Sequence, residues 1–251
     1  MNPLLFMILP RGGLLRDGGL STQNCIIQSL ASLPSLHSFT DGPEPAAAEL
    51  RHLHEQIEKS ESVDPTRLTK LLGLPDIEEG EGAVPYNFLL AVVDALPMLS
   101  KMTCSSTLVK GHRFPPRPVQ WLYPTGNTSM QSLLATSGIR FDWLPDILIF
   151  AIDKFEVSQH LPNTILYKPL AIDCPVSLKV ASTGSTIYKT RCYDLCATVQ
   201  DHAFCKYSVA HVRQSKSNLW YRAHNQDIRM IEQEEVIDPN TWLLFYQARK
   251  D

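Results

Sequence analysis

Residues 144–155 read LPDILIFAIDKF, with six apolar side chains in a row at 147–152. A run of this length, built from β-branched and aromatic residues, is typical of a buried strand. The same composition returns near the end of the chain as WLLFY at 242–246. Further extended segments are expected between and around these two, at 165–168, 193–200, 208–213 and 219–222. The second half of the chain is therefore predicted to form a sheet.

The first hundred residues carry helical patterns instead. Helices are predicted where apolar residues recur at helical spacing, or where helix formers are bounded by Pro and Gly. These segments are 25–33, 46–59, 65–72 and 85–96. One more short helix is expected up to Thr136, capped by Asn127 and Thr128. Helices followed by strands predict an α+β fold, with a cleft where the helical lobe meets the sheet lobe.

Composition excludes several classes of protein. The 251 residues are 44% hydrophobic and 20% charged, which is typical of a globular domain. With 23 basic and 26 acidic residues and no basic block, a nucleic-acid or anionic-membrane surface has no electrostatic support. Six cysteines without a CxxC pair favour a reducing intracellular compartment, cytoplasmic or nuclear. The apolar stretch 4–9 is too short for a membrane span and lacks the layout of a signal peptide.

Cys25 is the first candidate for covalent chemistry. It follows the polar stretch GGLSTQN at 18–24 and is expected to open the helix 25–33. A thiol at a helix start faces the positive end of the helix dipole, which favours the nucleophilic thiolate. Gln23 carries a side-chain amide that can donate a hydrogen bond to an oxyanion. The alternative interpretation of Cys25 is a small buried residue with a packing role.

The stretch 18–36, GGLSTQNCIIQSLASLPSL, resembles the cysteine box of the ubiquitin-specific proteases, usually GLxNxGNTCxxNSxLQxL. In this alignment Cys25 takes the position of the nucleophile and Gln23 that of the oxyanion-hole Asn. Thr22 stands where the family has Gly. The resemblance therefore assigns to Cys25 the attack on an isopeptide carbonyl.

Later segments are similar to other boxes of the same family, and they occur in the family's order. The matching segments are 85–96 (PYNFLLAVVDAL), 144–155, 193–199 (YDLCATV), 209–213 (VAHVR), 220–221 (WY), 234–236 (EEV) and 243–246 (LLFY). Together they span Gly19 to Tyr246. The zinc-binding CxxC pairs that many members carry are missing, so neither a structural zinc nor another cofactor is expected.

The resemblance implies a papain-like α+β fold, in which a helical lobe packs against an antiparallel sheet lobe across a cleft. It predicts an N-terminal extension at 1–18 and a protease-like domain at 19–251, mainly helical at 19–117 and mainly sheet at 118–251. The implied partner is ubiquitin or a ubiquitin-like modifier, free or attached to other proteins. Its C-terminal tail is expected to reach Cys25 at the mouth of the cleft.

The general base is the point at which this chain departs from the family. Aligning VAHVR places Tyr207 at the catalytic His, and His224, followed by Asn225, at the usual Asp or Asn. A cysteine protease needs an imidazole within about 2.6–3.2 Å of its nucleophile. A phenol, with a pKa of about 10, cannot replace it near pH 7. We therefore expect a deubiquitinase-like protein that is weak or inactive.

The sequence leaves two alternative functions open. The first is an active deubiquitinase that uses a displaced His. His224 and His202, the latter in the loop before the strand of Tyr207, are the candidates, whereas His211 lies roughly 13 Å along that strand. The second alternative is a protein-interaction scaffold that binds no ubiquitin.

Overall fold

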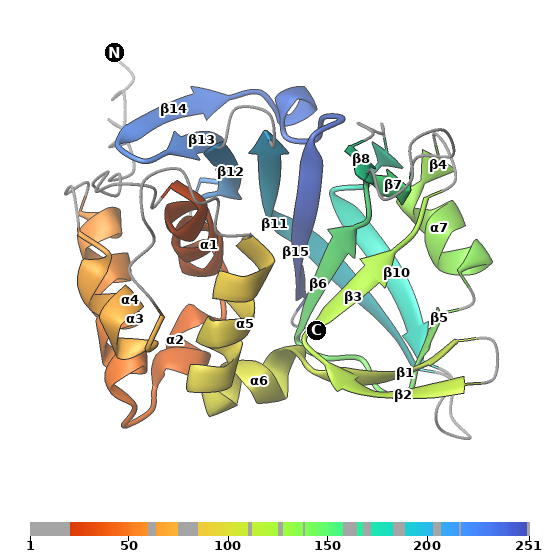
Figure 1. Cartoon of the computed structure of the whole chain (residues 1–251), viewed down its shortest axis with the longest axis horizontal. Coiled ribbons are helices and arrows are strands. Elements are labelled where there is room, and N and C mark those ends of the chain that lie inside the picture. Colours follow the sequence, from red (N-terminus) through yellow and green to blue (C-terminus); the bar gives the residue numbers. More distant parts are fainter. Residues whose placement is uncertain are drawn as a thin grey trace, which may run out of the picture.

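A computed structural model describes residues 21–59, 64–74, 85–109, 112–124, 128–137, 139–157, 165–167, 172–182, 189–202, 207–215 and 217–249. In this part of the chain helices come first and strands follow, as Figure 1 shows. This order confirms the predicted α+β class. The extension predicted at 1–18 lies outside the described residues. None of the described helices is long and apolar enough to cross a membrane.

The helical side of the molecule consists of α1 (Ser21–Ala31), α2 (Leu36–Thr40), α3 (Pro45–Glu58), α4 (Thr66–Leu71), α5 (Pro85–Ala95) and α6 (Pro97–Thr103). Pro45 and Pro97 occupy the first positions of α3 and α6, where a helix does not need the N–H that proline lacks. Gly73 follows the end of α4 with φ 64°, a left-handed conformation that terminates helices. The helices predicted at 46–59, 65–72 and 85–96 are thus confirmed within a residue or two.

The strands are β1 (Ser105–Val109), β2 (His112–Arg117), β3 (Val119–Leu122), β4 (Thr128–Ser129), β5 (Ile139–Phe141), β6 (Ile147–Ile152), β7 (Phe155–Val157), β8 (Ile165–Tyr167), β9 (Ile172–Asp173), β10 (Ser177–Ser182), β11 (Lys189–His202), β12 (Tyr207–Arg213), β13 (Trp220–His224), β14 (Asp227–Ile231) and β15 (Thr241–Ala248). The short 3-10 helix η1 (Gln233–Glu235) precedes β15. Because β1 and β2 follow α6 directly, strands already begin within the range 19–117 predicted as mainly helical.

The main sheet is mixed rather than antiparallel. Its longest path runs β14-β13-β12-β11-β10-β5-β1-β2, and β15 joins β11 to β6. Most neighbours are antiparallel, but β3 runs parallel to β6 and β10 runs parallel to β5. The β3–β6 pair can be parallel because the chain between these two strands makes a crossover that contains α7 (Met130–Thr136). The expectation of a purely antiparallel sheet is therefore wrong.

Both faces of the central strands are buried, which explains the continuous apolar run at 147–152. Ile147, Ile149 and Ala151 of β6 belong to a hydrophobic cluster shared with the helices. Leu148, Phe150 and Ile152 alternate with them and belong to a second cluster on the opposite face. A strand that is covered on both sides has no polar face, so its sequence does not alternate.

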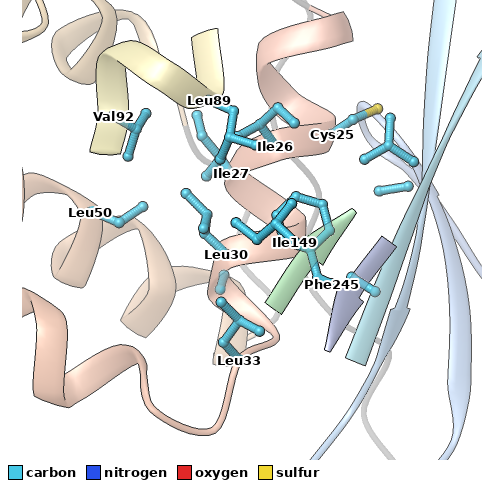
Figure 2. Close-up of a cluster of buried hydrophobic side chains, with 14 of the residues drawn as sticks. Cys25, Ile26, Ile27, Leu30, Leu33, Leu50, Leu89, Val92, Ile149 and Phe245 are labelled. Atoms are coloured by element: carbon cyan, nitrogen blue, oxygen red, sulfur yellow. The ribbon is translucent and has the colours of Figure 1, made fainter. Parts of the chain in front are cut away.

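Helix α1 lies between the sheet and the remaining helices. Figure 2 shows its labelled apolar side chains against neighbours from both sides: Leu50, Leu89 and Val92 from the helices, and Ile149 and Phe245 from the sheet. This position gives α1 little freedom to shift. It also fixes where the residues at the start of α1 meet the ends of the strands.

The cap of α7 differs from the one predicted. The side chain of Ser129 accepts a hydrogen bond from the backbone N–H of Ser132 at 3.1 Å, so Ser129 is the N-cap. Thr128 lies one residue before the N-cap and pairs with Ile172 in the β4–β9 ladder. Asn127 lies outside the described residues.

Candidate functional site

Cys25 lies in the second turn of α1 and does not open the helix. The helix already includes Ser21, so the backbone N–H of Cys25 falls within its hydrogen-bond ladder. The effect of the helix dipole is concentrated in the first turn. The expectation that Cys25 gains activation from a helix start is therefore wrong, because STQN at 21–24 forms helix rather than loop.

The side chain of Cys25 is 1% exposed. Its sulfur points from α1 toward the strands of the sheet, and the residue belongs to the cluster that joins the helices to the sheet (Figure 2). The expectation of a thiol at the mouth of a groove is therefore wrong. In this arrangement a carbonyl carbon cannot reach the sulfur unless the surrounding residues move.

Gln23 is fully buried and is held by α4. Its Oε1 accepts a hydrogen bond from Thr69 Oγ1 at 2.7 Å. The opposite atom of the amide, Nε2, has no acceptor among the residues that the structure describes. The Gln23 side chain thus has a fixed orientation, in which its N–H donors are not used by any described residue. This is the property that a preformed oxyanion donor requires.

Two side-chain hydrogen bonds tie the start of α1 to the sheet. Asn24 Nδ2 donates to Asn225 Oδ1 at 2.8 Å, and the hydroxyls of Thr22 and Ser208 lie 3.4 Å apart. Both contacts join residues roughly two hundred positions apart in sequence. We refer to these four residues, Thr22, Asn24, Ser208 and Asn225, as the polar seam. The seam brings the neighbours of Cys25 against the neighbours of the predicted base and acid positions.

Tyr207 and His224 lie together at this seam. Tyr207 begins β12 and His224 ends β13, and their ring centroids are 5.1 Å apart with the planes tilted by 45°. Asn225, directly after His224, has φ 54° and carries the seam acceptor. Besides Cys25, the structure therefore gathers the other four predicted site residues at one end of the sheet: Gln23 lies near α4, and Tyr207, His224 and Asn225 lie around the start of α1.

Of the other two histidines considered from sequence, His202 neighbours Tyr207 on the adjacent strand and His211 lies further along β12. His202 is the last residue of β11, where its backbone pairs with that of Tyr207, so the prediction of a loop position is wrong. His211 is buried further along β12, and its Nδ1 lies 3.0 Å from the carbonyl oxygen of Val236. Burial lowers the pKa of His211, which keeps the ring neutral. The hydrogen bond of His211 to Val236 links β12 to the segment that precedes β15, which is a structural role.

Sequence reasoning missed Thr22, Asn24 and Ser208 as parts of the site. The polar run before Cys25 was the available signal, since four polar side chains in a row at the start of an apolar helix need partners. In the described part of the chain no three His, Cys, Asp or Glu side chains gather as a metal-binding group.

Comparisons with known proteins support the fold. No sequence-family profile and no curated protein matches the chain. Among solved structures, the SAGA Ubp8/Sgf11/Sus1/Sgf73 DUB module bound to ubiquitin aldehyde matches with TM-score 0.72 and 16% identity, over 95% of this chain and 70% of that chain. The Ubp8-Sgf11-Sgf73-Sus1 SAGA DUB module matches with TM-score 0.68 and 15% identity, over 95% of this chain and 68% of that chain. A yeast SAGA DUB module with a mutant Sgf73 matches with TM-score 0.69 and 16% identity, over 100% of this chain and 71% of that chain.

These identities are too low to carry residue roles, but the coverage includes nearly the whole chain. The protein therefore has a fold related to that of a deubiquitinating module, which bears out the coarse part of the resemblance seen in its sequence.

Proposed function

We propose that this protein is a ubiquitin-specific-protease-like domain that binds ubiquitin or a related modifier and has lost efficient isopeptide cleavage. Fold similarity to DUB modules, one of them bound to ubiquitin aldehyde, supports the choice of modifier. The ordered sequence boxes from Gly19 to Tyr246 support the same family. A cytoplasmic or nuclear location of the protein stays a prediction that is consistent with this proposed function.

The observation that carries the loss of turnover is Tyr207 at the start of β12, with its ring centroid 5.1 Å from that of His224. Cleavage of an isopeptide needs a group that takes the proton of the thiol and later gives a proton to the departing lysine amine. A neutral phenol is a poor base near pH 7, and a phenolate is a poor acid. With a tyrosine at the base position, neither transfer has an efficient partner.

The burial of Cys25 supports the same conclusion by a separate argument. In the proposed reaction the sulfur attacks the carbonyl carbon of the modifier's C-terminal residue, and Gln23 donates to the resulting oxyanion. This attack needs a reacting distance of about 3–3.5 Å. Since Cys25 is 1% exposed, such an approach requires the residues packed around Cys25 to move first.

A second candidate is a slow enzyme in which His224 replaces the missing base. What favours it is that the imidazole of His224 already lies at the site, against Tyr207. His224→Ala distinguishes the two: it removes residual cleavage if His224 is the base and changes nothing if the protein does not cleave.

The decisive experiment uses ubiquitin with a C-terminal electrophile, incubated with the full chain. We expect no covalent adduct above that of the Cys25→Ser control, measured by intact mass. An adduct that forms rapidly with the unmodified protein and disappears in Cys25→Ser contradicts the inactive assignment.

Ubiquitin binding is tested separately, by titrating isotope-labelled free ubiquitin with the protein and recording NMR spectra. We expect saturable shifts in a contiguous set of ubiquitin signals. Unchanged spectra at high protein concentration favour the alternative of a scaffold without ubiquitin binding.

A further inference from the structure

A small hollow lies beside β2, away from the polar seam. Its volume is about 160 Å³, and three aromatic side chains, Phe114, Trp121 and Tyr123, form much of its lining together with Arg117. Tyr123 is 67% exposed, and Phe114 is also exposed. We refer to it as the aromatic hollow. Aromatic residues and arginine that lie together at a surface are the composition of protein-binding hot spots.

Strand β2 leaves the hollow uncovered. All its residues from His112 to Arg117 are exposed, and among the described strands it pairs only with β1. Pro115 and Pro116 lack the N–H that a further strand would need. A partner therefore cannot extend the sheet at these two residues, and side-chain contacts must carry the recognition.

Trp121 forms a rigid wall of the hollow. Its ring centroid lies 5.2 Å from that of Tyr86 in α5 and 6.4 Å from that of Trp242 in β15. These contacts hold the indole in place before any partner arrives. A preformed aromatic wall reduces the entropy that binding costs.

Arg117 supplies an exposed positive charge at the rim. Its guanidinium lies 5.5 Å from the centre of the Phe114 ring, and Gln120 Nε2 donates to its backbone carbonyl at 3.0 Å. No carboxylate of the described residues forms an ion pair with it. An exposed guanidinium held in place beside an apolar hollow is complementary to a carboxylate that flanks an apolar side chain.

We propose that the aromatic hollow docks a segment of a partner protein in which one apolar side chain is flanked by acidic residues. The apolar side chain enters between Phe114, Trp121 and Tyr123, and a neighbouring carboxylate pairs with Arg117. The size of the hollow decides against a small molecule, because such sites measure about 300–1,000 Å³, whereas 160 Å³ holds a single side chain. This docking is independent of the proposed ubiquitin binding.

The test uses a fluorescein-labelled peptide in which one Phe is flanked on both sides by Asp and Glu. A control peptide carries Asn and Gln in their place. Fluorescence anisotropy with the full chain is expected to show saturable binding of the acidic peptide, and weaker binding as salt rises. Arg117→Glu and Tyr123→Ser are each expected to weaken binding by about tenfold, which is the effect of losing one charged or aromatic contact.

Arg140→Glu is the matched control for charge. Arg140 lies beside Leu108 of β1, whereas Phe114 lies beside Thr107, so Arg140 is on the opposite face of the same strands. Its substitution is expected to leave binding unchanged, and circular dichroism checks that all variants fold.

Four results overturn the proposal: no saturable binding of the acidic peptide, equal binding of the neutral peptide, equal loss with Arg140→Glu, or displacement of the peptide by free ubiquitin. The last result assigns the hollow to the ubiquitin-binding surface instead.

Discussion

Asn225 contributes to the polar seam through both its side chain and its backbone. It accepts the hydrogen bond of Asn24 and adopts a left-handed conformation, with φ 54°. Asparagine tolerates this region better than residues with an ordinary β-carbon, and glycine tolerates it best. Substitutions at this one position can therefore separate the hydrogen bond from the backbone conformation.

We predict that Asn225→Ala lowers the free energy of unfolding by about 2–3 kcal/mol, since it removes a buried acceptor and adds backbone strain. Asn225→Gly removes the acceptor alone and is expected to cost about 1–2 kcal/mol. Urea unfolding of both variants measures the difference. Equal losses contradict a conformational contribution from residue 225.

His211 gives the fold a dependence on pH. Its pKa is lowered in the folded state, mainly by burial, and the hydrogen bond to Val236 and nearby carboxylates only partly oppose this. The unfolded chain therefore takes up a proton at this position as pH falls below about 6.5, while the folded chain does not. The contribution of His211 to stability is complete above that pH and is lost progressively below it.

We predict that His211→Asn, which can still donate to Val236, makes stability less sensitive to pH. The measurement is urea unfolding of both proteins at pH 7.5 and pH 5.5. The unmodified protein is expected to lose more stability between the two conditions than the variant. Identical losses contradict a buried neutral imidazole.

The residue-level prediction from sequence was partial for a physical reason. Alignment indicated Cys25, Tyr207, His224 and Asn225, because each follows or precedes a recognisable strand or helix pattern. It did not indicate the contacts of Thr22, Asn24 and Ser208, which depend on pairs that meet only after the chain folds.

At the scale of elements, α1 is the helix on which the fold depends most directly. Ile26, Ile27 and Leu30 are completely buried, and α1 packs against α3, α5 and three strands of the sheet. A cavity in this position cannot be filled by a movement of one neighbour alone. We predict that Ile27→Ala lowers the free energy of unfolding by about 2–5 kcal/mol.

Met230→Ala is the control for this prediction. Met230 lies on β14 and is 61% exposed, so its truncation is expected to change stability by less than about 0.5 kcal/mol. Thermal unfolding of both variants gives the comparison. Similar losses in the two variants contradict a central position for α1.

Elements with strong local patterns were predictable, and those without them were not. The run at 147–152 forms β6 with the predicted bounds, because apolar residues on both faces give a signal that does not depend on context. Strand β2 was missed since HRFPPR contains two prolines and no alternation. Strand β10 alternates between exposed and buried residues, and this period of two is the sequence signal by which β10 can be recognised.

At the scale of the whole molecule, the helices and the sheet are closed against each other around Cys25, at the polar seam. The direct evidence is the burial of Cys25, together with hydrogen bonds from Asn24 and Thr22 to the sheet. Sequence order predicted the two layers correctly. It could not predict the seam, because burial at an interface depends on how the side chains of both layers fit together.

The central claim is that the domain binds ubiquitin without cutting it, and one measurement with ubiquitin linked at its C-terminus to rhodamine tests both parts. A rise in anisotropy reports binding, and a later fall, as the released dye tumbles faster, reports cleavage in the same sample. We predict a saturable rise in anisotropy, with release no faster than for Cys25→Ser. Release that depends on Cys25, or anisotropy that does not rise, would contradict the claim.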